Sequence, residues 1–346
     1  MAAVDPEAGL ARLDGAEDLD YDVGAVCLGA ETAFYDIPGL REHATPLKRL
    51  EHARQIREQY QDVLEGDGRV VVGGAGRSGV QVAGELAAMS REHGHGANDD
   101  GERDGNAEDA PEVVLLEQLA SVAPNFPENF QRAVADALGE RGVEIRTNAT
   151  VTSVDDESIA VADGDDLGYD QLVWTGGLQG PAALDDERPV VRSDLRLAGD
   201  TFAVGDAARV VDTDGEAVPA SAQAAIREAR VAAKNVTALV GHRLDGTGGF
   251  EPRLARYSFD SPGWLVSVGD GAVAQVGGSV LTGRAALALK TSVGAGYLGS
   301  VGAVENAVDL VQSELGLSVD EESDAEHGDE ESDDDPGDDE TLDPES

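Results

Sequence analysis

The chain has 346 residues, 41% of them hydrophobic, which is enough to bury the cores of two compact domains. Its 69 acidic residues outnumber its 25 basic ones, and the formal net charge of −44 argues against a nucleic-acid partner, because phosphate binding needs a basic surface. The same excess, spread along the chain with arginine preferred to lysine, indicates a halophilic protein, since molar salt screens the repulsion between carboxylates.

The first 64 residues predict one short strand and one helical run. VGAVCL at residues 23–28 is an apolar strand entering a glycine turn, expected at an edge or in an insertion because nothing before it offers a partner. The helical run covers residues 45–64. With no signal-peptide pattern, no apolar run of membrane-spanning length and only one cysteine, Cys27, the sequence predicts a cytoplasmic protein without an intrachain disulfide or a cysteine-rich zinc site.

Residues 69–117 predict a strand, a glycine loop, a helix and a second buried strand. VVVGGAGRSGVQVAGEL at 70–86 supplies the first three, and EVVLLE at 112–117 is the second strand. The charged segment 90–111 between them is rich in Gly, Asp and Asn and is expected to be a solvated loop. His93 and His95 in this loop are expected to be solvated rather than metal ligands, and no metal site is predicted.

The remaining residues alternate between strand and helix patterns. Residues 142–170 resemble a small antiparallel meander before a buried strand. A helix is expected from Pro219, where alanine, isoleucine and valine recur at helical spacing. The other predicted elements are strands at 171–174, 201–204, 264–268 and 272–276, two helical stretches after Gly283, and an acidic tail at 317–346 without ordered structure.

The glycine loop has the spacing of a dinucleotide-binding loop at Gly74, Gly76 and Gly79. Such glycines permit a tight turn, admit a diphosphate and let helix and strand approach closely. Glu117 ends the next strand, where a carboxylate accepts from an adenosine ribose and repels a 2′-phosphate, which favours NADH over NADPH. Two alternatives stay open: a chance glycine cluster, and a solvated Glu117 at a strand end.

TFAVGDAA at 201–208 is a second candidate site. The buried strand leads through Gly205 to Asp206, whose carboxylate could bind a ribityl hydroxyl at the mouth of a nucleotide site. A simple turn is the alternative for an isolated Gly-Asp pair.

Read in order, five segments resemble the two-dinucleotide flavoproteins, and most closely the type II NADH dehydrogenases of haloarchaea. The segments are YDVGAVCLGAET, VVVGGAGRSGVQVAGEL, YDQLVWTGG, TFAVGDAA and ASAQAAIREARVAAKNV. The resemblance implies an α/β fold with two Rossmann-like dinucleotide-binding domains, the first incomplete and discontinuous, and a C-terminal α+β extension. It implies the following domains: partial FAD-binding at 1–66 and 166–255, NADH-binding at 67–165, a C-terminal domain at 256–316, and the tail at 317–346.

The resemblance also implies residue roles. Gly74, Gly76, Gly79 and Glu117 match the family's NADH site, and Gly29, Gly205, Asp206 and Ala222 match positions around FAD. Gln223 matches a position facing the flavin and the quinone, and is the expected catalytic residue. The chain departs from the family at Gln81, where a glutamate beside the nicotinamide is usual, and at Arg227, where a second glutamine is usual. The family's first FAD-binding glycine loop is expected upstream of Met1.

The implied function is hydride transfer from NADH to FAD and electron transfer to a quinone or similar acceptor, which needs ring stacking rather than an acid or base. Two alternatives stay open: a flavin-less NAD(H)-binding module, and a flavoprotein reductase for a protein acceptor. The family allows a homodimer and peripheral contact with the inner face of the cell membrane. The apolar face of residues 301–315 fits membrane contact or core packing. Trp174 and Tyr297 are expected to be packing residues.

Overall fold

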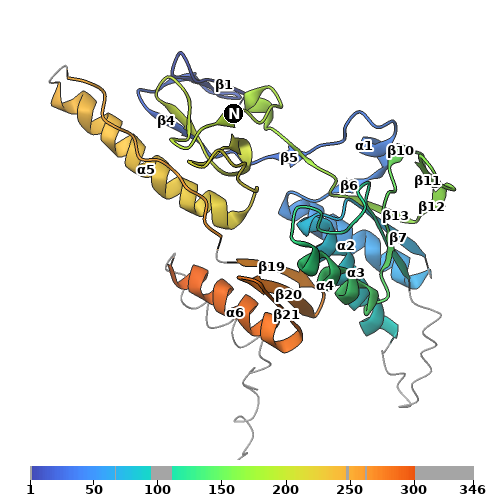
Figure 1. The fold of residues 1–346 in the computed structure, drawn as a ribbon. Helices are drawn as coiled ribbons and strands as arrows, with labels where there is room; N and C mark the ends of the chain where they lie inside the picture. Colours follow the sequence, from blue (N-terminus) through green and yellow to red (C-terminus); the bar gives the residue numbers. More distant parts are fainter. Residues whose placement is uncertain (1, 67, 95–110, 247–248, 262, 301–346) are drawn as a thin grey trace, which may run out of the picture. The chain divides into compact units, whose positions relative to one another are not determined.

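The computed structural model describes residues 2–66, 68–94, 111–246, 249–261 and 263–300, and the chain divides into two units, Met1–Lys290 and Thr291–Ser346. The first unit contains a five-stranded sheet in the order β6-β13-β7-β8-β9, in which every pair of neighbours is parallel (Figure 1). Its strands are β6 (Thr45–Pro46), β7 (Arg69–Gly73), β8 (Glu112–Leu116), β9 (Glu144–Arg146) and β13 (Gln171–Trp174). The predicted α/β class is confirmed.

Both faces of this sheet are covered, which explains why its strands are continuous apolar runs. Side chains alternate between the faces with a period of two. Val70 and Val72 of β7 join a core with the helices, whereas Val71 between them joins a core with the strands β10–β12. The helices are α2 (Leu50–Glu65), α3 (Arg77–Gly94) and α4 (Glu128–Gly139). The covering strands are β10 (Val151–Val154), β11 (Ser158–Val161) and β12 (Leu167–Gly168), and α1 (Leu40–His43) lies beside them.

A second, smaller sheet joins two distant parts of the chain in the order β16-β17-β4. Its strands are β4 (Gly24–Val26), β16 (Arg196–Ala198) and β17 (Thr201–Ala203). Strand β4 runs parallel to β17, so their carboxyl ends lie together and the turn of Gly205 follows at that edge. Helix α5 (Ala222–Asp245) contributes Ala232 and Leu239 to the core around Phe202.

The other elements are short or lie outside these two sheets. A C-terminal antiparallel sheet packs Val266, Val268 and Val273 against the helices of the parallel sheet. Its strands are β19 (Gly263–Val268), β20 (Gly271–Val276) and β21 (Ser279–Thr282), followed by α6 (Gly283–Ser300). The remaining strands are β1 (Ala3–Asp5), β2 (Leu10–Arg12), β3 (Leu19–Asp20), β5 (Glu31–Thr32), β14 (Leu178–Gln179), β15 (Val190–Val191) and β18 (Arg209–Val210). No helix in the described part of the chain is both long and apolar enough to cross a membrane.

Three sequence predictions need correction. The helical run expected from residue 45 begins at Leu50, because Thr45 and Pro46 pair with β13 as a strand. The first strand of the expected meander, β9, joins the parallel sheet instead, and only β10–β12 are antiparallel. Helix α3 continues to Gly94, so residues 90–94 of the loop expected at 90–111 are helical. Residues 301–346, with the predicted second helical stretch and acidic tail, lie outside the described residues, as does His95.

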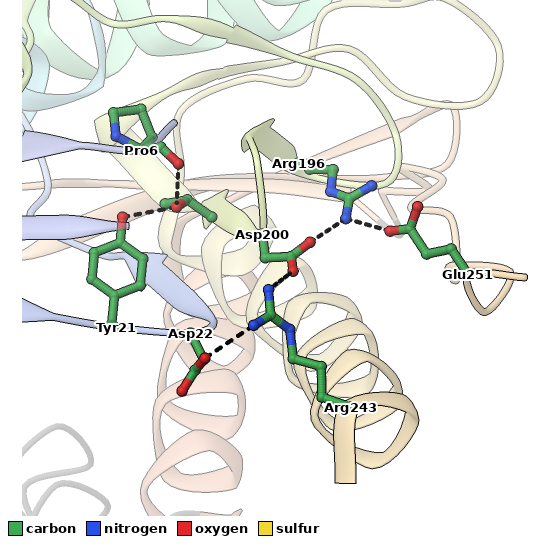
Figure 2. A network of polar contacts seen from close by, with 8 residues as sticks. Pro6, Tyr21, Asp22, Arg196, Asp200, Arg243 and Glu251 are labelled. Atoms are coloured by element: carbon green, nitrogen blue, oxygen red, sulfur yellow. Dashed lines mark hydrogen bonds and ion pairs between the residues drawn. The ribbon is translucent and has the colours of Figure 1, made fainter. Parts of the chain in front are cut away.

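An ion-pair network fixes the second sheet to its surroundings (Figure 2). Asp200, at the β16–β17 turn, binds Arg196 of β16 and Arg243 near the end of α5. Arg243 also lies 3.0 Å from Asp22, which precedes β4, and Arg196 binds Glu251. The network therefore ties α5 and the segment before β4 to the same hairpin.

We expect Asp200→Asn to destabilise the protein by about 1 kcal/mol at neutral pH, because most of the ion pairs are partly exposed. Burial opposes ionisation of Asp200, but the two arginines outweigh it and lower its pKa. The ionised group therefore stabilises the fold above the unfolded pKa near 3.8, and this stability is lost as the pH falls through the lower folded pKa. Chemical denaturation at several pH values measures the free energy of unfolding of the wild type and of Asp200→Asn. An equal difference in free energy at acid and neutral pH would contradict the stabilising role of ionised Asp200.

Candidate nucleotide site

The glycine loop lies between β7, the central strand of the parallel sheet, and the start of α3, as predicted. Gly74 adopts a φ of 94°, which side chains other than glycine rarely tolerate. A Cβ at Gly79 would overlap the carbonyl oxygen of Gly74, so this position requires glycine for close approach. A Cβ at Gly76 would meet no atom of the described residues within 4 Å beyond its own chain neighbours, so the space beside Gly76 is open.

The polar side chains of Glu117 and Thr175 hold the loop in this shape. The carboxylate of Glu117 is 6% exposed and accepts from the backbone N–H groups of Ala75, at 2.8 Å, and Leu119, at 2.9 Å. From the other side, the Thr175 hydroxyl donates to the carbonyls of Gly73 and Gly74. Glu117 thus organises the loop as well as lining its cavity, a role that the strand-end pattern did not reveal.

The loop opens into a cavity of about 970 Å³, within the size range of small-molecule sites. One wall contains Gly74, Gly76 and Glu117. A second part of the lining, called the Asp206 wall below, contains Asp206 and residues 219–222, which lead into α5. The structure therefore brings the two candidate sites of the sequence into one cavity.

The Asp206 wall is shaped by a turn and a helix start. Gly205 has a φ of 68°, and its N–H donates to the carboxylate of Glu228 at 2.7 Å. Asp206 lines the cavity and lies 3.1 Å from the ammonium of Lys48. Helix α5 starts at Ala222 because the Ser221 hydroxyl caps it by accepting from the Ala224 N–H, so the helix begins three residues after Pro219.

Two of these contacts involve residues that the sequence patterns did not single out. Lys48 is one of only three lysines in the chain, and it follows β6 at the cavity. Glu228 is 2% exposed and occupies the buried stripe of α5 with Ala224 and Ala232. Its position four residues from each of these alanines could have predicted, from the sequence, a buried carboxylate with a polar partner. Burial raises the pKa of Glu228, against the hydrogen bond from Gly205.

Of the other predicted residues, Gly29, Gln81 and Gln223 are not part of the cavity lining, whereas Trp174 is. Gly29 has a φ of 71° in the turn after β4, and Gln223 is half-buried one residue beyond Ala222. Gln81 is exposed on α3. Trp174 is buried in the core, where its ring N–H donates to the Ala33 carbonyl at 2.8 Å, and its edge also reaches the cavity. Among the described residues, no cluster of His, Cys, Asp and Glu could hold a metal ion.

The two loop glycines provide a matched pair for mutagenesis. Gly79→Ala should lower the melting temperature and abolish nucleotide binding, because the Cβ overlaps the backbone of Gly74. Gly76→Ala should leave the melting temperature nearly unchanged and weaken binding of NADH about tenfold or more, because its Cβ enters space that a diphosphate would occupy. Thermal unfolding and NADH titration measure both effects, and normal NADH binding by the folded Gly76→Ala protein would exclude a ligand at this loop.

Comparison with known proteins adds the following findings. Residues 2–229 match the family model described as pyridine nucleotide-disulphide oxidoreductase. The chain is 28% identical over 228 residues to a type II NADH:quinone oxidoreductase of Haemophilus influenzae, covering 61% of this chain and 47% of that protein. It is 26% identical over 290 residues to the demethylphylloquinone reductase NdbB of Synechocystis, covering 79% of this chain and 65% of that protein. The chain thus spans less than two thirds of these relatives.

Solved structures show the same fold. NDH2 from Plasmodium falciparum in complex with NADH aligns with a TM-score of 0.70 at 17% identity, covering 86% of this chain and 78% of that one. The ferredoxin reductase for the CYP199A2 system of Rhodopseudomonas palustris aligns with a TM-score of 0.61 at 20% identity, covering 80% of this chain and 63% of that one. The predicted Rossmann-like architecture is confirmed.

Proposed function

Because the chain belongs to the pyridine nucleotide-disulphide oxidoreductase family, we propose that it acts in a flavin-dependent NADH dehydrogenase that passes electrons to a quinone or similar acceptor. The observation that carries the proposal is the single cavity shared by the glycine loop and the Asp206 wall. NADH on the loop and a flavin on the Asp206 wall would meet in this space. The name of one relative, NADH:quinone oxidoreductase, contains both substrates, and the name of the other, demethylphylloquinone reductase, contains a quinone.

The residues of the Asp206 wall fit the flavin end of FAD. Gly205 lets the backbone turn where a side chain would be strained, and Asp206 offers a carboxylate to ribityl hydroxyls. The N-terminus of α5, at Ala222, lines the cavity and carries partial positive charge. This charge would stabilise negative charge on a reduced flavin ring. Bound there, FAD would supply the group that accepts hydride from NADH. Gly29, in the turn after β4, and Gln223, in the first turn of α5, are proposed to complete this site.

On the NADH side, the chain positions the dinucleotide without acid or base chemistry. Gly74 and Gly76 admit the diphosphate, and α3 directs its N-terminus toward it. Glu117 keeps the loop in place and presents a carboxylate where the adenosine ribose would lie. The chain's contribution is therefore alignment of two rings across the cavity.

Titration of the purified full chain with NADH and with FAD, followed by an assay of NADH oxidation with menadione, tests the proposal. We expect both ligands to bind and NADH oxidation to depend on FAD and menadione. Binding of NADH without FAD would instead favour a nucleotide-binding module without catalysis. Reduction of a protein acceptor but not of menadione would favour a flavoprotein reductase.

The position of Glu117 predicts a preference for NADH over NADPH of about tenfold or more, because a carboxylate repels the 2′-phosphate. Glu117→Gln removes this repulsion and should narrow the preference. Competition titrations measure the ratio, with Glu85→Gln on the exposed side of α3 as the charge-matched control. An unchanged ratio in Glu117→Gln would show that another group selects the nucleotide.

The proposal includes adaptation to high salt and a place in electron transport at the inner face of the cell membrane, where a quinone is dissolved. A homodimer and peripheral membrane contact stay predictions, and residues 301–315 fit either membrane contact or core packing. The net charge of −44 predicts that the melting temperature rises between about 0.1 M and about 1 M KCl, as the Debye length falls from ~10 Å to ~3 Å. A melting temperature independent of salt would contradict halophilic adaptation.

A further inference from the structure

Arg77 occupies an unusual position at the glycine loop. It is the first residue of α3, directly after Gly76, and its side chain lines the shared cavity. One guanidinium N–H donates to the carbonyl of Ala220 in the Asp206 wall. The side chain therefore lies at the helix end toward which a diphosphate on this loop would be drawn.

Among the described residues, the charged group that acts on Arg77 is the carboxylate of Asp206. In the part of the chain that the structure describes, no carboxylate forms an ion pair with Arg77, and its hydrogen bond goes to a neutral carbonyl. Asp206, whose charge acts on Arg77, is already paired with Lys48. Burial lowers the pKa of Arg77, and the attraction of Asp206 opposes this shift.

An arginine in this situation is unexpected in a chain whose acidic residues outnumber the basic ones by 69 to 25. A guanidinium has five N–H donors, and the contact with Ala220 uses one nitrogen of the group. The remaining donors of a partly desolvated cation beside an open glycine loop are suited to two oxygens of a phosphate.

We propose that Arg77 binds the diphosphate of the dinucleotide held by the glycine loop and is a specific affinity determinant of this site. The proposal rests on the function proposed above and adds a charged ligand to a loop that otherwise offers backbone N–H groups. A diphosphate occurs in both NADH and FAD. We assign Arg77 to NADH because it directly follows Gly76 on the loop, and FAD is included in the test because the Arg77 side chain also reaches Ala220 of the Asp206 wall.

The test compares Arg77→Gln and Arg77→Lys with the wild-type full chain. Arg77→Gln removes the charge and keeps a hydrogen-bond donor, and should weaken NADH binding about tenfold, since charge-assisted bonds exceed neutral ones. Arg77→Lys should recover part of the loss. Arg57→Gln, on the exposed face of α2, changes the net charge equally and should bind NADH like the wild type. Fluorescence titrations with NADH and with FAD, at low and high KCl, supply the affinities, and melting temperatures verify folding.

The salt dependence separates a ligand-binding role from a purely structural one. If Arg77 binds the diphosphate, the difference between wild type and Arg77→Gln shrinks at high KCl, because salt screens the lost attraction. A folded Arg77→Gln protein with wild-type NADH affinity overturns this inference and leaves the proposed function unaffected. Weakened FAD binding with unchanged NADH binding also overturns it, because the diphosphate is then not on the loop. Failure of the wild type to bind NADH removes the proposed function and this inference with it.

Discussion

The glycine loop between β7 and α3 keeps its shape because polar side chains that follow two neighbouring strands bind its backbone. Glu117, after β8, accepts the N–H of Ala75, and Thr175, after β13, donates to the carbonyls of Gly73 and Gly74. Strand β7 lies between β8 and β13 in a parallel sheet, so the carboxyl ends of all three strands are aligned. This alignment places a carboxylate and a hydroxyl on either side of the loop. Everything proposed about nucleotide binding depends on it.

The cavity combines two kinds of wall with different electrostatics. The glycine loop offers backbone N–H groups and a helix start, whereas the Asp206 wall carries the Lys48–Asp206 ion pair and the beginning of α5. Buried Glu228 fixes Gly205 beside that pair, so the turn is held by the same helix whose N-terminus meets the cavity. Basic residues are scarce in this chain, yet Lys48 and Arg77 both line the cavity that anionic nucleotides would enter. Binding and selectivity therefore arise from a few placed charges.

The sequence was sufficient for features that depend on local pattern. Strand β13 was predicted to the residue, and the strand–loop–helix unit was placed correctly, because apolar runs and glycine spacing are local signals. The early start of the helix at residue 45 was wrong because a pairing with a strand over 120 residues later takes Thr45 and Pro46. The antiparallel assignment of β9 failed for the same reason, since pairing with β8 is not visible in its own residues.

The sequence pointed to the loop glycines and to Asp206 as candidate site residues. It did not predict the contacts between distant residues. Lys48 reaches Asp206 across 158 positions of the chain, and Arg77 reaches Ala220 across 143. No periodicity or spacing reports such pairs. Glu228 could have been found from its place among buried alanines, but its partner Gly205 could not. The side chains that set the charge of the cavity are thus the part that needed the structure.

The central claim is that one cavity holds the dinucleotide so that its nicotinamide faces the Asp206 wall. A crystal structure of the full chain with NADH tests this most directly. We expect the diphosphate against Gly74 and Gly76 and the nicotinamide directed across the cavity toward Asp206 and Ala222. A dinucleotide bound outside this cavity, or one whose nicotinamide points away from that wall, would contradict the account.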